Sequence, residues 1–388
     1  MQLTSSKNEF MRILVIPITL CFLSLANCQK NSEIEDADTP VIVRAEKYWN
    51  WYHEKRETIY DGNGEWGTAF YGFKDVLRNS YWIGDVYGRL SKTIHKNSTL
   101  FGIRAKEISN YIVQAQTNGT TGVIGIPDEP NHPEFGDKIR EIENSYPQGI
   151  INGWIVELPN KNITELYYDH GYALVSLCRE YQRTKEPTLT TPINDAANWI
   201  LNNYLISNNE NYHSAVSKGL CYSYEVTNNI TYLEKAVEIH KTLIIPHQQN
   251  DGMWDDDHNR RLVYHAFITS GLIALKRVLP EGHYFQNTLN ASLTKAIEAL
   301  VSECNTNKNS TYSESVVGWP GACIMAFIEL SDIRTLTKSE KEALEIAVDF
   351  IISSEMWLNN NFNNSETLGM LRVSAPMGLY VSKFGYEK

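Results

Sequence analysis

Apolar residues recur three and four positions apart through most of the chain beyond residue 42, the spacing that gives an α-helix one apolar face. Three segments of this pattern resemble one another, at 168–174, 212–220 and 264–272. The last two share Tyr-His followed, after five residues, by Gly-Leu, and successive histidines are about 40 to 50 residues apart. Since this interval is close to one helical hairpin, the repeat predicts a stacked or closed array of hairpins.

A second helical pattern follows each of these segments, for example at 232–243 and 289–301. Glycine-rich turns separate the helices, and the turn at 248–254 has the pattern Gln-x-x-x-Gly-x-Trp, which resembles the turn motif of α/α-toroid proteins such as terpenoid cyclases. We therefore expect residues 43–388 to form one all-α domain, in which six or seven hairpins close into an (α/α)6–7 toroid. The stretch 119–163 is rich in Gly, Pro and Asn and too long for an ordinary connection, which predicts a functional loop over one mouth.

The first 28 residues differ in character from the rest of the chain. A charged start, a short apolar run and small residues before a break are typical of a secretory signal, and the run is short and poorly flanked for a membrane span. The end of this segment, 25–28, resembles a bacterial lipobox in which Cys28 receives the lipid anchor, whereas ordinary cleavage after Ala26 is the alternative. Residues 29–42 form a polar linker. The sequence thus predicts an exported bacterial protein, periplasmic or anchored to the membrane as a lipoprotein.

Charge and cysteine usage exclude several classes of protein. The chain carries 46 acidic and 35 basic side chains, a net charge of −11, and it has no Lys/Arg cluster, so a nucleic-acid partner is not expected. The four cysteines beyond residue 28 contain no Cys-x-x-Cys pair, which excludes a disulfide scaffold and makes zinc ligation by cysteine improbable. The motifs of serine hydrolases, P-loop proteins, dinucleotide-binding folds and zinc proteases are absent, and we expect neither a metal nor a cofactor.

In a closed toroid the inner helices begin at one mouth, which brings their first residues together. Aromatic and imidazole side chains gathered there would suit a carbohydrate, because rings stack on sugar faces and polar edges bind hydroxyl groups. The alternative is that Tyr-His at a helix start serves repeat packing, with the imidazole hydrogen-bonded to a neighbouring turn. The residues expected at the mouth are Trp66, Tyr71, His170, His213, Tyr264, His265 and Trp319.

The segment 255–265 is the most polar entry into an apolar helix. Arg260 and Arg261 precede Tyr264 by about one turn and could hold a carboxylate in a bidentate contact beside the phenol. The alternative is a solvated loop whose aspartates cap the helix. The run 255–257 could also supply glycosidase carboxylates or a Ca²⁺ site, although three consecutive side chains point in different directions.

The pattern Asn211-x-His213-Ser214 at one helix start, followed some 50 residues later by the two arginines and Tyr264, resembles uronate-polysaccharide lyases. The similar families are the alginate, glucuronan and ulvan lyase toroids of marine and gut Bacteroidetes and related oligosaccharide dehydratases. The resemblance implies an acidic poly- or oligosaccharide substrate. It also implies catalytic roles for Tyr264, His213 and Arg260 or Arg261, with Asn211 or Glu210 neutralising the substrate carboxylate.

The chemistry of these families explains why such residue types are needed. β-Elimination removes the C5 proton of a uronate and expels the oxygen on C4, which leaves a 4,5-unsaturated uronyl end. Cationic or hydrogen-bonding groups must take up the charge that develops on the carboxylate. A tyrosinate can remove the proton, and the phenol so formed can protonate the leaving oxygen. A glycosidic leaving oxygen makes the enzyme a polysaccharide lyase, and a free hydroxyl makes it a dehydratase.

Two other functions fit the same sequence. A glycoside hydrolase on the toroid would use two carboxylates, and a glycan-binding lipoprotein would use the aromatic side chains as stacking surfaces without catalysis. The candidate hydrolase carboxylates are Asp169, Asp256, Asp257 and Glu314.

Overall fold

Helices make up almost all of the computed structural model, which describes residues 39–58, 77–117, 122–131, 136–159, 164–203, 209–308, 319–353 and 375–386. The chain divides after Thr39, and everything described below belongs to the second unit, Pro40–Lys388. The signal predicted at 1–28, with Cys28, lies outside the described residues, as do Trp66, Tyr71 and Glu314. The roles expected for them therefore stay predictions.

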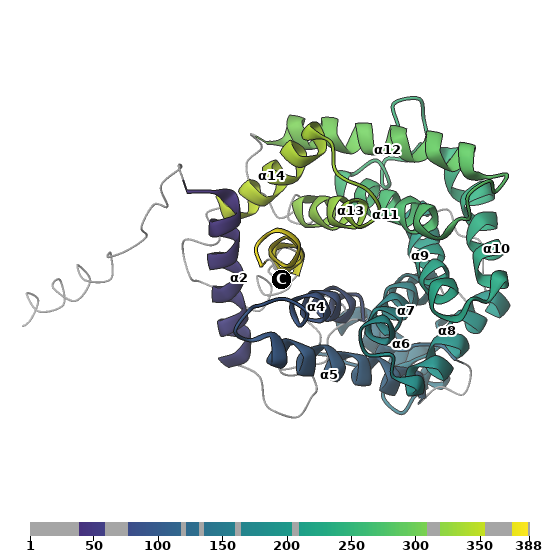
Figure 1. Cartoon of the computed structure of the whole chain (residues 1–388). Coiled ribbons are helices and arrows are strands. Elements are labelled where there is room, and N and C mark those ends of the chain that lie inside the picture. The colour runs from purple at the N-terminus through teal and green to yellow at the C-terminus, as the bar shows by residue number, and fades with distance from the viewer. Residues whose placement is uncertain are drawn as a thin grey trace, which may run out of the picture. The chain divides into compact units, whose positions relative to one another are not determined.

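The helices of the second unit form two concentric rings (Figure 1). The outer ring contains α2 (Val41–Thr58), α5 (Ser98–Thr117), α8 (Thr190–Asn203), α10 (Ile230–Ile239), α12 (Gln286–Asn307) and α14 (Lys338–Ile352). The inner ring contains α4 (Leu77–Leu90), α7 (Thr164–Thr184), α9 (Glu210–Thr227), α11 (Leu262–Val278), α13 (Trp319–Ile333) and the helical segment 375–384. Helix α10 continues into the π-helical turn η4 (His240–Ile244) and the 3-10 turn η5 (Ile245–His247), and the 3-10 turn η3 (Pro187–Leu189) precedes α8.

The pattern of buried residues along a helix shows whether it belongs to the inner or the outer ring. Every residue from Trp319 to Leu330 in α13 is buried, because an inner helix is surrounded on all sides. In α12 the buried residues recur mainly at steps of three and four, including Leu289, Leu293 and Ala296, and most of the remaining positions are polar. Such a helix buries one face only, as an outer helix must.

The segment 375–384 closes the ring between the first and last inner helices. The ammonium group of Lys383 lies 2.9 Å from Oδ1 of Asp332, next to the end of α13. On the other side, Gly378 packs so closely against α4 and α2 that an added Cβ would lie 2.5 Å from Val86 and 2.7 Å from Trp49. Residues far apart in the sequence thus meet where the circle closes.

At two places, the turn after an outer helix binds the next outer helix through a glutamine side chain. Nε2 of Gln116, at the end of α5, donates to the carbonyl of Pro192 at 2.7 Å in α8. Nε2 of Gln248, after α10, donates to the carbonyl of Ser292 at 3.1 Å in α12. These two Gln-containing turns therefore join α5 to α8 and α10 to α12.

A glycine in each turn makes the close approach to the next helix possible. Gly122 has φ +83° and Gly252 has φ +86°, a left-handed conformation that other residues rarely adopt. An added Cβ would lie 2.4 Å from the carbonyl oxygen of Asp195 in the first turn and 2.2 Å from that of Lys295 in the second. Glycine is required at both positions because the backbone is left-handed there and because a Cβ would collide with the next outer helix.

The histidines of the repeat complete this contact. Nε2 of His170 lies 2.9 Å from the carbonyl of Ala196, and Nε2 of His265 lies 2.9 Å from the carbonyl of Ala296. Each carbonyl is four residues beyond the one that accepts from the glutamine, so the two docking sites repeat position by position. The backbone N–H of Ile124 also donates to Nδ1 of His170 at 3.0 Å. These two histidines have the packing role that was the alternative for the repeat.

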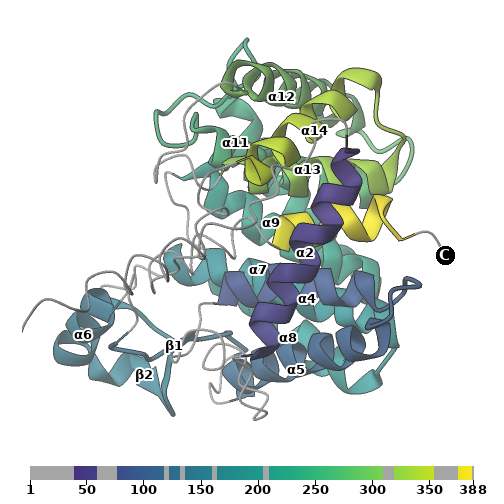
Figure 2. The same cartoon turned by 90° about the vertical axis from the view of Figure 1, so that its left-hand side faces the viewer.

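The long connection between α5 and α7 contains the strands of the described structure. Strands β1 (Ile126–Pro127), β2 (Ile150–Ile151) and β3 (Trp154–Ile155) form an antiparallel sheet in the order β1-β3-β2, with Ile155 opposite both Ile126 and Ile150. Helix α6 (Gly136–Ser145) and the turn η1 (Pro147–Gly149) precede β2. Figure 2 shows α6 and the sheet at the end of the molecule where α7 begins.

The prediction of an all-α toroid is confirmed, and the described residues supply six hairpins for it. The described parts of the loop predicted at 119–163, residues 122–131 and 136–159, contain helix α6 and two-residue strands, which the helical pattern did not predict. Among the described residues, no helix has the length and apolar character needed to cross a membrane.

Candidate active site

Two carboxyl groups meet where α9 and α11 begin. Glu210 is the first residue of α9, and Asp256 lies in the loop that leads to α11. Burial raises the pKa of Glu210 to about 7, and its hydrogen bond and like charge with Asp256 act in the same direction. Burial opposes ionisation of Asp256 as well, but hydrogen bonds from the backbone and side chain of Asn259, from Glu210 and from the backbone of His258 lower its pKa. Below about pH 7 the pair holds one proton, on Glu210, and Asp256 is the carboxylate.

Two buried asparagines connect this pair to the rest of the site. Nδ2 of Asn259 donates to Oδ2 of Asp256 at 2.7 Å and to Oε2 of Glu210. Nδ2 of Asn211, the second residue of α9, donates to Oδ1 of Asn259 at 3.1 Å and lies 3.2 Å from Nε2 of His258. Both asparagines are 1% exposed, so their hydrogen bonds are made within the protein and not with solvent.

An imidazole and a phenol lie at the more open side of the cluster. The rings of His258 and Tyr264 stack with centroids 4.0 Å apart and planes 23° apart. Burial lowers the pKa of His258, and the charge of Arg261 acts in the same direction against the charge of Asp256. Both rings are half-buried, so they are accessible from the mouth. His258 is therefore neutral at pH 7.

The two arginines of the loop have different surroundings. Arg260 pairs with Asp251 at 2.7 Å and contacts the carbonyl of Trp254 at 3.4 Å. Arg261 is exposed, and among the described residues its guanidinium makes no hydrogen bond or ion pair, although its charge reaches His258. Arg261 is thus available for an anionic ligand beside His258.

A histidine and a further carboxylate lie next to Glu210. Nδ1 of His247 is 2.9 Å from Oδ2 of Asp255 and 3.7 Å from Oε1 of Glu210. One ligand atom from each of these residues lies within 4.8 Å of the others, so the three could in principle hold a metal ion. Asp255 and His247 are both more than two-fifths exposed and already satisfy each other.

Aromatic rings close the axis of the inner ring below these polar groups. Tyr168 and Tyr172 from α7 lie 4.9 Å apart, and Tyr172 meets Phe267 of α11 at 6.0 Å. Trp82 of α4 stacks on Phe267 at 6.0 Å. Deeper still, Lys218 of α9 pairs with Glu329 of α13 at 2.5 Å. The centre of the ring is therefore packed with side chains.

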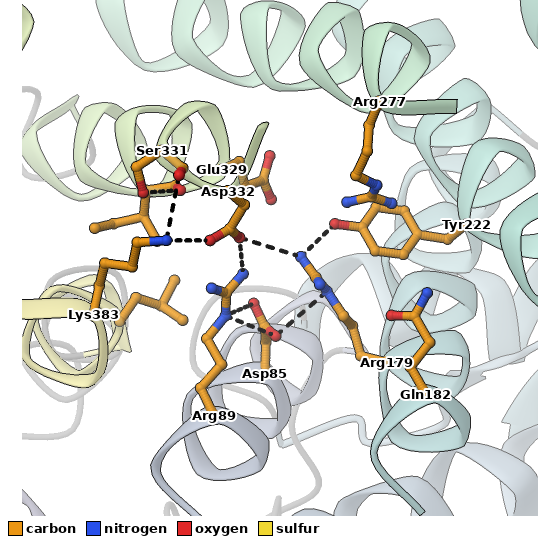
Figure 3. Close-up of polar contacts among 12 residues, drawn as sticks. Asp85, Arg89, Arg179, Gln182, Tyr222, Arg277, Glu329, Ser331, Asp332 and Lys383 are labelled. Carbon is orange, nitrogen blue, oxygen red and sulfur yellow. Dashed lines mark hydrogen bonds and ion pairs between the residues drawn. The ribbon is translucent and has the colours of Figure 1, made fainter. Parts of the chain in front are cut away.

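The opposite end of the axis holds a separate network of charges (Figure 3). Asp85 and Arg89 of α4 pair with each other at 3.2 Å, and Arg89 also reaches Asp332 at 2.9 Å. Arg179 donates to the hydroxyl of Tyr222 at 2.6 Å. These residues lie toward the ends of the inner helices, where the helix dipoles converge and cations stabilise the exposed carbonyl groups. The network joins α4, α7, α9, α13 and the segment 375–384, and it is remote from Glu210.

The other residues expected at the mouth are placed as follows. His213 is 2% exposed and has the same position in the repeat as the packing residues His170 and His265. Burial lowers the pKa of both of those histidines to about 4, and neither has exposed surface for a substrate. Trp319 is buried at the start of α13 against Phe350 of α14, with ring centroids 5.0 Å apart.

The structure thus brings together Glu210, Asn211, Arg261 and Tyr264 among the expected residues. It adds His258 and Asn259, to which sequence reasoning gave no role although both belong to the polar run before α11. The usable signal was the position of that run, since polar residues directly before an inner helix must lie at the mouth. Which of them turn inward depends on the loop conformation, and Asp256 fixes it by accepting from the backbone N–H groups of His258 and Asn259 at 2.9 Å.

No family model and no curated protein matches the sequence. Solved structures resemble the fold. A sugar epimerase from a ruminal bacterium has 10% identity and a TM-score of 0.59, covering 90% of this chain and 100% of that one. A polysaccharide lyase has 8% identity and a TM-score of 0.53, covering 90% and 99%. An unsaturated glucuronyl hydrolase from Streptococcus agalactiae, in complex with dGlcA-GalNAc6S, has 10% identity and a TM-score of 0.54, covering 89% and 93%. At these identities the shared property is the α/α-toroid fold.

Proposed function

We propose that this protein is a glycan-processing carbon–oxygen lyase that acts by β-elimination on uronic-acid-containing poly- or oligosaccharides. The observation that carries the proposal is the composition of the cluster at the starts of α9 and α11. A protonated Glu210 flanks the stacked rings of His258 and Tyr264, together with Arg261, which has no ion pair within the described part of the chain. Export, as predicted from residues 1–28, would bring such an enzyme to extracellular polymers.

Binding of the uronate carboxylate is the first requirement of the reaction. An ionised glutamate at this position would repel the substrate carboxylate, whereas a protonated Glu210 adds no negative charge and gives its proton to Asp256. Arg261 supplies a positive charge without having to give up an existing ion pair. Together these groups would stabilise the negative charge that moves onto the carboxylate when the C5 proton leaves.

Proton transfer is the second requirement. We assign removal of the C5 proton to Tyr264, the first acidic side chain of α11 after the exposed Arg261. The C5–H bond breaks toward the phenolate, the electrons form the C4–C5 double bond, and the C4–O bond breaks. The resulting phenol can return its proton to the leaving oxygen. No atom is gained or lost beyond this transfer, and both a glycosidic and a hydroxyl oxygen fit.

The carboxylate distances argue against hydrolysis by this cluster. Glycosidases keep their two carboxyl groups about 5–5.5 Å apart when retaining and about 6.5–9.5 Å apart when inverting. Glu210 and Asp256 share a hydrogen bond, and the nearest oxygens of Glu210 and Asp255 lie within 4.8 Å. The hydrogen-bonded pair of Glu210 and Asp256 leaves no room for a sugar ring or a water molecule between its members.

Incubation of the purified protein with oligosaccharides of mannuronate, guluronate and glucuronate tests the proposal. Elimination produces a conjugated unsaturated uronyl end, which absorbs in the ultraviolet. Hydrolysis would release reducing ends without that absorbance, and a binding protein would give neither signal. New reducing ends without ultraviolet absorbance, or no turnover of any uronate, would overturn the lyase assignment.

A further inference from the structure

The chain of hydrogen bonds behind His258 has a direction that the residues themselves determine. Ionised Asp256 offers only acceptor atoms, so the atom of Asn259 that lies 2.7 Å from its Oδ2 must be the amide nitrogen. The same nitrogen also bonds Oε2 of Glu210. The amide of Asn259 is therefore held in one orientation, with its oxygen on the opposite side from the carboxyl pair.

The orientation of the Asn259 amide in turn fixes the orientation of the Asn211 amide. Oδ1 of Asn259 accepts from Nδ2 of Asn211 at 3.1 Å, and turning the Asn211 amide over would place two oxygens opposite each other. The present orientation leaves Oδ1 of Asn211 buried without a hydrogen-bond partner among the described residues. An acceptor left unpaired in this way normally costs stability. The unpaired Oδ1 indicates that the hydrogen bonds of Nδ2 determine the orientation of the Asn211 amide.

The remaining hydrogen on Nδ2 of Asn211 faces Nε2 of His258, 3.2 Å away. A neutral imidazole has one protonated and one unprotonated nitrogen. Because the amide donates, Nε2 must be the unprotonated acceptor, and the ring proton must be on Nδ1. A hydrogen on Nε2 would oppose the amide hydrogens, so the imidazolium form is disfavoured as well.

We propose that Asn259 and Asn211 are positioning residues that transmit the ionisation of Asp256 to His258 and hold it as the neutral Nδ1–H tautomer. The catalytic consequence rests on the proposed function: His258 would serve the uronate as a hydrogen-bond donor and not as the base, which leaves proton removal to Tyr264. The tautomer itself is a property of the folded protein and does not depend on any substrate.

The charged and titratable groups around His258 come from three elements. Asp256 and Arg261 belong to its own loop, Tyr264 to α11, and Glu210 reaches it from α9 through the two asparagines. Of these, Asp256 favours protonation of the imidazole and Arg261 opposes it. Reversing the donor at Asn211 should therefore change both the tautomer and the titration of this histidine.

Nuclear magnetic resonance on the full chain with ¹⁵N-labelled histidine measures both properties. The His258 signals are identified by their loss in His258→Gln. We expect a protonated Nδ1 and an unprotonated Nε2 in the wild type. In Asn211→Asp the new carboxylate accepts where the amide donated, so the proton should move to Nε2 and the pKa of His258 should rise by about one unit or more. Asn144→Asp makes the same change on the exposed α6 and should alter neither.

The outcomes separate the relay from the proposed function. A wild-type His258 with its proton on Nε2 would overturn the relay, whatever the enzyme does with uronates. The same holds if Asn211→Asp keeps the proton on Nδ1. The wild-type measurement needs no variant to fold, so it decides the tautomer even if Asn211→Asp is unstable. Conversely, an Nδ1–H tautomer in a protein without lyase activity would refute only the proposed function.

Discussion

The properties of single residues in the site come from how completely each is surrounded. Glu210 is buried next to an ionised carboxylate and keeps its proton, whereas Arg261 is exposed and unpaired among the described residues, and so can meet an anion. Tyr264 has a twin in the repeat, Tyr212, which occupies the equivalent position at the start of α9. The proposed roles can therefore be tested by replacing each residue and a matched residue of the same type.

Replacing Tyr264 by Phe tests the assigned base. The variant keeps the ring that stacks on His258 and loses only the hydroxyl, so the free energy of unfolding should change by about 1 kcal/mol or less. Loss of a proton-transfer group should lower kcat on the order of 10²–10⁴-fold. Tyr212→Phe removes the same atom from the repeat twin and should retain turnover. Near-normal turnover of a uronate by Tyr264→Phe would remove Tyr264 from the mechanism.

The two arginines of the loop should differ in their effect on substrate. Arg261→Ala removes an unpaired guanidinium beside His258, and a charge-assisted hydrogen bond of this kind corresponds to roughly a 10- to 100-fold change in kcat/KM. Arg260→Ala breaks an exposed pair with Asp251 and should change kcat/KM by less than about threefold. Steady-state kinetics on one uronate oligosaccharide compares them. Equal losses in both variants would contradict the selection of Arg261.

The raised pKa of Glu210 has a consequence for stability against pH. The folded protein holds this proton up to about pH 7, whereas the unfolded chain releases it near 4.5. The folded state binds more protons between these values, so this group makes stability fall as the pH rises from about 5 to about 7. In Glu210→Gln the amide can still donate to Asp256 and does not titrate. Urea unfolding at pH 5 and pH 7.5 should show a smaller decrease in the variant, by up to about 3 kcal/mol. Parallel pH profiles would show that Glu210 ionises normally.

At the scale of the elements, the repeat could be predicted from sequence because its residues contact backbone. Gln116 and Gln248 bind carbonyl groups of the next outer helix, and His170 and His265 bind carbonyls four residues further on. Such contacts need only the residue type and its place in the hairpin, so the periodicity predicts the helices. The periodicity does not predict that the same histidines face the outer helices and not the mouth. That depends on the side to which each helix turns.

The glycine of the second turn should be irreplaceable for two separable reasons. Gly252→Ala would meet both the left-handed conformation and the carbonyl of Lys295, which is 2.2 Å from the added Cβ. Gly282 has φ +80° with nothing within 4 Å of such a Cβ, so Gly282→Ala meets the conformation alone. We expect about 1–2 kcal/mol of destabilisation from Gly282→Ala and at least about 2 kcal/mol more from Gly252→Ala. Urea unfolding measures both, and equal values would show that the turn does not press against α12.

For the whole molecule, the closed ring explains both what the sequence predicts and what it leaves undetermined. Helical spacing and the repeat predict six or seven hairpins in sequence order, because each hairpin buries its apolar face on the next. The site needs more, since Glu210 begins α9 and Asp256 lies in the loop before α11, so the two meet only after these neighbouring hairpins have packed together. Asn259 and His258 acquire their roles from that meeting, so composition and spacing alone could not assign them.

The segment 375–384 completes the packing of the ring between α4 and α13. Deleting residues 375–388 would expose Val86 and Trp49 and remove the partner of Asp332, which also pairs with Arg89. We expect the shortened chain to lose its single cooperative unfolding transition and to bind a hydrophobic dye. Lys383→Ala in the full chain removes only the part-exposed ion pair, and should cost about 1 kcal/mol or less. Calorimetry and dye fluorescence compare the two proteins. Because each inner helix packs on its neighbours around the circle, an open ring exposes apolar surface on α4 and α13 together. A shortened chain that still unfolds cooperatively near the wild-type temperature would mean that the remaining hairpins form an autonomous stack.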